Sequence, residues 1–122
     1  MTEEQKTEII DLDTLLSKCA TLKEKGYRLV QIGCTETETE IQINYTFDKN
    51  YEFINLRLLS KRGESVPSIQ SVYDCAFIYE NEIAELFGIN VTDMPIDFKG
   101  KLYKTAVSAP FALNPEKQEE IL

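Results

Sequence analysis

Three carboxylates lie within a stretch whose other residues are mostly apolar, residues 79 to 89, which reads Tyr-Glu-Asn-Glu-Ile-Ala-Glu-Leu-Phe-Gly-Ile. On a helix, Glu82 and Glu85 would be three residues apart and could come close together. A close carboxylate pair can act as general acid and base, as in glycoside hydrolysis. Nothing in the sequence marks a substrate cleft beside the pair, so catalysis is the least favoured interpretation of this stretch.

Glu80 differs from the other two acids because its helical neighbours are apolar. At about 100° per residue, its face of a helix over residues 77–87 also carries Ile83, Ala84 and Phe87. Glu82 and Glu85 are predicted to point to the other half of the helix. An ionised carboxylate on an apolar face costs free energy unless a cation or several hydrogen-bond donors meet it.

Local cations for Glu80 are missing from the sequence. Residues 64–97 contain seven acids and no Lys or Arg. Two interpretations therefore stay open. Glu80 is either part of a solvated acidic face, as charge runs usually are, or it pairs with a cation from another subunit or from Arg57, Lys61 or Arg62.

The residue types that are absent exclude several kinds of site. The chain has no His, which removes Ser-His-Asp and Cys-His nucleophiles and imidazole metal ligands. Its five glycines are scattered and form no phosphate-binding loop. Cys19, Cys34 and Cys75 are far apart, so they offer no Cys-x-x-Cys pair and are best interpreted as small apolar groups. We therefore expect no cofactor in this chain.

Charge and hydropathy limit the partners and the location. A chain of 122 residues with a formal charge of −8 repels phosphate groups, so nucleic acid and anionic membrane are poor partners. No apolar run approaches the ~20 residues of a membrane-spanning helix. The acidic N-terminal residues 1–6 do not resemble a signal peptide. We expect a cytoplasmic protein.

The first half of the chain predicts one helix and three strands. Leucines and Cys19 recur at helical spacing over residues 12–25, and Gly26 is placed to end that helix. Alternating apolar residues follow in the segments 27–34, 41–47 and 51–59, with turn residues between the last two. The pattern indicates a three-stranded antiparallel sheet with the helix on one face.

The second half predicts a helical layer and a tail. Pro67 is expected to start that layer, and Gly88 suits the left-handed position that closes a helix. Beyond residue 105 the regular pattern fades, and Pro110 and Pro115 deny the segment a continuous helix. The predicted fold class is α+β, an antiparallel sheet of three or more strands packed with two helices. We expect residues 1–105 to form one domain and residues 106–122 to form an extended tail that packs on a partner subunit.

The carboxylate stretch resembles the signature Glu-x-Glu-x-x-Asp/Glu-Leu-Phe-Gly-Ile of the complex I 30-kDa subunit family. The matching residues are Glu80, Glu82, Glu85, Leu86, Phe87, Gly88 and Ile89. Residues 66–69, Val-Pro-Ser-Ile, are similar to the family's entry into this helix, and residues 94–105 are most similar to the short version of this subunit in Ech-type energy-converting hydrogenases. Many complex I relatives have Arg and His where this chain has Asn81 and Met94, which favours the hydrogenase branch.

The resemblance implies a cofactor-free hydrophilic subunit of a membrane-bound energy-converting nickel-iron hydrogenase, a ferredoxin:proton oxidoreductase coupled to ion translocation. The nickel-iron centre and iron-sulfur clusters would lie in its partners, the large catalytic subunit and the small iron-sulfur subunit, with ferredoxin as electron partner. The chain would sit on the inner face of the cell membrane through those partners. A formate hydrogenlyase, a quinone-reducing complex I relative and a free-standing regulatory or ligand-binding domain are the alternatives. The residues implied for the subunit interface are Glu80, Glu82, Glu85, Phe87, Gly88, Pro95, Tyr103 and Phe111.

Overall fold

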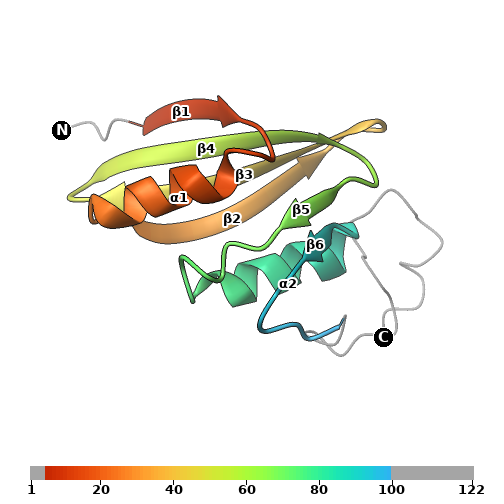
Figure 1. The fold of residues 1–122 in the computed structure, drawn as a ribbon. Coiled ribbons are helices and arrows are strands. Elements are labelled where there is room, and N and C mark those ends of the chain that lie inside the picture. The colour runs from red at the N-terminus through yellow and green to blue at the C-terminus, as the bar shows by residue number, and fades with distance from the viewer. Residues whose placement is uncertain (1–4, 100–122) are drawn as a thin grey trace, which may run out of the picture.

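The protein has an α+β fold in a computed structural model that describes residues 5–99 (Figure 1). Its main sheet has the strand order β1-β4-β3-β2. The strands are β1 (Gln5–Ile10), β2 (Arg28–Glu36), β3 (Glu40–Lys49) and β4 (Glu52–Lys61), and helix α1 (Leu15–Glu24) lies across them. The predicted fold class is confirmed.

Strands β2, β3 and β4 form the antiparallel meander that the apolar alternation predicted. In β3 the odd-numbered residues from Ile41 to Phe47 are buried, and the even-numbered ones between them are half-buried. β3 pairs antiparallel with both β2 and β4. The predicted turn is present, with Asn50 and Tyr51 at positive φ. Because side chains alternate across a strand, one face of the sheet collects the apolar residues.

Strand β1 was not predicted, because its residues Gln5–Ile10 are mostly polar. It pairs parallel with β4, so the sheet is mixed rather than wholly antiparallel. The side chains from Lys6 to Ile9 are exposed, and that of Ile10 is buried. An edge strand with exposed side chains shows weak apolar alternation, which explains why periodicity missed it.

A second layer is formed by helix α2 (Ala76–Phe87) and a small parallel sheet of β5 (Ser65–Pro67) and β6 (Asn90–Thr92). The expectation that Pro67 starts a helix was wrong. Pro67 ends β5, and backbone hydrogen-bonded turns over residues 69–76 precede the helix. Figure 1 shows β5 and β6 beside α2.

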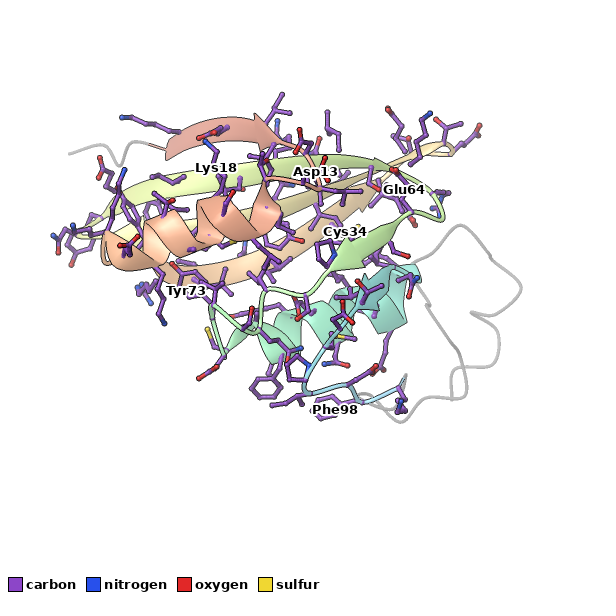
Figure 2. The ribbon with its side chains drawn as sticks, viewed as in Figure 1. Asp13, Lys18, Cys34, Glu64, Tyr73 and Phe98 are labelled. Carbon is purple, nitrogen blue, oxygen red and sulfur yellow. The ribbon has the colours of Figure 1, made fainter. Side chains whose placement is uncertain are left out.

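One core joins the two layers. Phe47 of β3 contacts Tyr73 with ring centroids 5.4 Å apart, and the Tyr73 hydroxyl donates a hydrogen bond to the backbone carbonyl of Tyr27 at 2.8 Å. In Figure 2, Tyr73 lies in the segment that leads into α2, next to helix α1. The fold thus places α2 against the apolar side of the sheet.

Candidate functional site

The centre of the site is the Glu80 carboxylate, which is 1% exposed. Its Oε1 accepts hydrogen bonds from the Ser68 hydroxyl at 2.7 Å and from the Gln70 side-chain amide at 3.1 Å. Its Oε2 accepts one from the backbone N–H of Ile69 at 2.7 Å. A single carboxylate on α2 therefore holds the loop that follows β5.

Gln70 extends the network to the loop that follows β6. Its side-chain amide donates to the Ile96 carbonyl at 3.1 Å, and its side-chain oxygen accepts from the Ile96 N–H at 2.9 Å. Ile96 is thus held at both of its backbone groups by one side chain. The Gln70 amide joins Glu80 to this second loop.

Asn81 fixes the same loop from the helix side. Its side-chain amide donates to the carbonyls of Phe77 at 2.7 Å and Ile96 at 3.0 Å. Its side-chain oxygen accepts from the Phe98 N–H at 2.9 Å. Phe98 also contacts Phe77 edge to face, with centroids 6.1 Å apart, and Figure 2 shows it below α2. The two adjacent helix residues Glu80 and Asn81 thus bind two different loops.

A glycine determines where helix α2 ends. It stops at Gly88, which has φ 71° and ψ 27° and donates its N–H to the Ala84 carbonyl at 3.0 Å. This is the left-handed closure that the sequence predicted, and glycine adopts it without steric cost. Ile83, which is only 2% exposed, anchors the helix in the core about one turn after Glu80.

The solvated interpretation of Glu80 was wrong, and so was its pairing with one of the three cations at the sheet. The side chain is buried, and within residues 5–99 no Lys or Arg pairs with it. Arg57 donates to Asn44 on the sheet, Arg62 pairs with Glu36, and Lys61 is exposed. Burial raises the pKa of Glu80 above its ordinary value of 4.5, and the three hydrogen bonds lower it by less than burial raises it. Neutral donors take the place of the expected cation.

The raised pKa of Glu80 predicts how stability depends on pH. The folded state holds this proton more tightly than the unfolded chain, so the stability that Glu80 contributes is fully present below pH 4.5 and falls as the pH rises through its folded pKa. Glu80→Gln removes the titration. Denaturation of both proteins at several pH values should show a free-energy difference, wild type minus variant, that declines above pH 4.5 and then levels off. A difference that grows with pH would contradict the raised pKa.

The remaining site residues from the sequence are not all in one place. Glu85, predicted on the other half of the helix from Glu80, is buried with 9% of its surface exposed, and Glu82 and Phe87 are half-buried. Pro95 is exposed in the loop that Asn81 and Gln70 hold. Tyr103, Phe111 and the predicted tail lie outside the described residues.

Sequence reasoning missed Ser68, Gln70 and Asn81 as binding partners of the network. Ser68 was visible within the Val-Pro-Ser-Ile match, and Asn81 was noted only as a departure from the family pattern. Gln70 gave no signal. Its role depends on two loops 26 residues apart in sequence meeting at one amide, which only the tertiary structure shows.

The cysteines do not form a redox pair among the described residues, where all three are free thiols. Burial is the main cause that raises the pKa of the Cys19 and Cys34 thiols to about 12, so both stay protonated and apolar at neutral pH. Residues 5–99 contain no cluster of three or more metal-ligating side chains. Neither helix in that range has the length and apolar character needed to cross a membrane.

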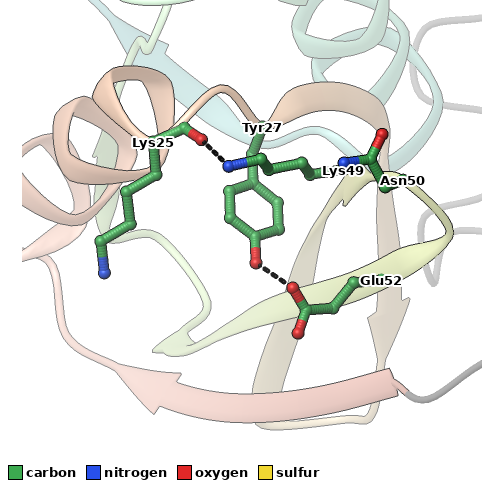
Figure 3. Close-up of a pocket in the computed structure, with 5 residues that line it drawn as sticks. All are labelled: Lys25, Tyr27, Lys49, Asn50 and Glu52. Carbon is green, nitrogen blue, oxygen red and sulfur yellow. Dashed lines mark hydrogen bonds between the residues drawn. The ribbon is translucent and has the colours of Figure 1, made fainter.

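A pocket of about 490 Å³ lies apart from the network, at the turn between β3 and β4 (Figure 3). Its lining residues are Lys25, Tyr27, Lys49, Asn50 and Glu52. Two hydrogen bonds cross it, from the Lys49 ammonium to the Lys25 carbonyl at 2.6 Å and from the Tyr27 hydroxyl to Glu52 at 2.7 Å. Because these polar groups already bind one another, the pocket is a weaker candidate than the Glu80 network.

The chain is similar to known proteins in its fold and in its sequence. A chain in the structure of the membrane-bound sulfane sulfur reductase, an archaeal respiratory membrane complex, has a similar fold, with a TM-score of 0.72. The two are 17% identical, and the match covers 97% of this chain and 68% of that one. Among curated proteins, none matches by sequence. The model of the family described as "Respiratory-chain NADH dehydrogenase, 30 Kd subunit" matches residues 9–110, which include the whole Glu80 network. The chain therefore belongs to the family of the 30 Kd subunit of respiratory-chain NADH dehydrogenase.

Proposed function

We propose that the chain is the cofactor-free hydrophilic subunit of a membrane-bound energy-converting nickel-iron hydrogenase. It would brace the peripheral arm of the complex against the large nickel-iron subunit and the small iron-sulfur subunit. Electrons from ferredoxin would pass through those partners, and the chain would be peripheral on the cytoplasmic side of the membrane. Family membership supports a role as a subunit of a respiratory complex, and the resemblance of residues 94–105 to the short Ech-type version of this subunit supports this particular host.

The observation that supports the proposal is that the signature carboxylate, Glu80, binds groups of the protein itself. Glu80 is buried, and its two oxygens accept three hydrogen bonds from the protein itself. A carboxylate engaged in this way shapes a surface rather than transferring protons to a bound substrate. The surface that it shapes includes the loop with exposed Pro95 and Ile96, and Ile78 of α2 is exposed as well. These apolar groups suit contact with another subunit.

A sulfur-reducing respiratory complex is the second candidate host. The structural neighbour belongs to a membrane-bound sulfane sulfur reductase and shares the fold across almost the whole chain. At 17% identity this likeness supports the architecture and leaves the host to experiment. A quinone-reducing relative would fit the family description equally.

Affinity purification of the tagged full chain from native membranes tests the proposal. We expect the large and small hydrogenase subunits to co-purify, with nickel and iron in the complex and neither metal in the chain after the subunits are separated. Co-purified sulfur-reductase or quinone-reductase subunits would replace the proposed host by the other candidate. A chain that purifies alone, or that retains stoichiometric metal by itself, would contradict a role as a cofactor-free subunit.

A further inference from the structure

One face of the main sheet is covered by no helix within the described part of the chain. The buried apolar residues of β3 and β4 point to the side of α1 and α2, and the residues that alternate with them point to the opposite side. We call this opposite side the helix-free face. Its central residues are Ile9, Asn44, Asn55, Arg57 and Leu59.

Hydrogen bonds join two asparagine side chains and Arg57 on the helix-free face. The Asn55 amide donates to the Asn44 side-chain oxygen at 3.1 Å, and the Arg57 Nε donates to the same oxygen at 3.0 Å. Asn44 lies opposite Arg57 in the register of β3 and β4. Asn55 is buried, with 5% of its surface exposed, although no helix lies over it. These hydrogen bonds hold the Arg57 guanidinium in a fixed orientation.

Arg57 has no carboxylate partner among residues 5–99, unlike the other two arginines of the chain. Arg28 pairs with Asp48, Arg62 with Glu36 and Lys18 with Glu8. In a chain with a formal charge of −8, a half-buried Arg bound only to a neutral amide is unusual. Its two terminal NH₂ groups keep the planar fork that binds a carboxylate with two parallel hydrogen bonds.

Two exposed aliphatic side chains flank Arg57. Ile9 lies beside it in the parallel register of β1 and β4 and is 64% exposed. Leu59 lies two residues further along β4, on the same face, and is 48% exposed. An oriented cation between two exposed aliphatic groups matches a ligand segment that has an acid next to apolar residues.

We propose that the helix-free face docks a segment of a partner subunit in which an Asp or Glu is flanked by aliphatic residues. The carboxylate binds the Arg57 fork, and the aliphatic side chains cover Ile9 and Leu59. A second copy of this chain is a poorer occupant, because a two-fold contact centred here would bring two Arg57 side chains together. The net charge of −8 opposes a phosphate-bearing ligand. The inference rests on the proposed role as a subunit of a complex.

Arg57→Gln tests the docking, and Arg28→Gln is its matched control. Arg28 lies on another strand of the same sheet, but its partner Asp48 is within the chain. With the tagged full chain in native membranes, we expect Arg57→Gln to lower the co-purified partner subunits about tenfold or more, and Arg28→Gln less than about twofold. Thermal unfolding of each purified variant checks that it folds. Equal recovery with both variants would overturn the docking site and leave the proposed function standing.

A photo-crosslinking amino acid at position 9 gives an independent readout that keeps Arg57 intact. We expect a crosslink to a partner-subunit peptide that contains Asp or Glu beside aliphatic residues, with the same amino acid at position 16 of α1 as control. A crosslinked homodimer, or a crosslink to lipid, would overturn the inference. Partners from a different host complex would contradict the proposed hydrogenase, and the Arg57 comparison would still decide the docking site. A wild-type chain without partners would contradict both.

Discussion

Replacing Glu80 with Ala is expected to lower the free energy of unfolding by on the order of 3 kcal/mol, because three donors lose their acceptor inside the protein. The stranded groups are the Ser68 hydroxyl, the Ile69 N–H and the Gln70 amide. The Ala variant also leaves a cavity where a fully buried side chain stood. Chemical denaturation of the purified chain measures the change.

Glu24→Ala is the matched control for Glu80→Ala. Glu24 ends α1 and is exposed, and its side chain makes no hydrogen bond or ion pair among the described residues. Its removal should change the free energy of unfolding by less than about 0.5 kcal/mol. Similar small losses for both variants would show that the Glu80 network adds nothing to stability. Glu80→Gln should fall between the two, since one amide oxygen replaces two carboxylate oxygens.

Replacing Asn81 with Leu is expected to cost about 2 kcal/mol and to release the loop after β6. The variant keeps the number and branching of the side-chain heavy atoms but leaves the Phe98 N–H without an acceptor and removes one of two donors to the Ile96 carbonyl. Gln70 still holds Ile96, so the loop should loosen chiefly at Phe98. Hydrogen exchange at the Phe98 amide should be faster by about tenfold or more.

Asn90→Ala provides the comparison for Asn81→Leu. Asn90 is an exposed asparagine whose side chain makes one hydrogen bond, to the Ser65 hydroxyl at 2.8 Å. Its loss should cost less than about 1 kcal/mol and leave exchange at Phe98 unchanged. Unchanged exchange at Phe98 in Asn81→Leu would mean that the loop keeps its conformation without the Asn81 bonds.

The sequence was informative wherever a pattern is local. Apolar alternation predicted β3 because each odd-numbered residue enters the same core. Gly88 predicted the end of α2 because few other residues adopt a left-handed backbone at low cost. The signature around Glu80 identified the family, which the match over residues 9–110 confirmed. The extent of the domain to residue 105 and the role of the tail stay predictions.

The tertiary structure decided which groups meet across long separations. Polar β1 became an edge strand because β4 offered it a free row of backbone groups, which side-chain pattern does not encode. The sequence identified Glu80 as a carboxylate in need of partners but pointed to cations, because charge is visible in a sequence and backbone donors are not. Its real partners depend on the turn after β5, which aims an N–H, a hydroxyl and an amide at one point. Likewise, the sequence showed only that Arg57 alternates with Leu56 and Leu58. The completed sheet showed that Arg57 lies on the face away from Glu80. Strand pairing and helix packing together determine which face is covered.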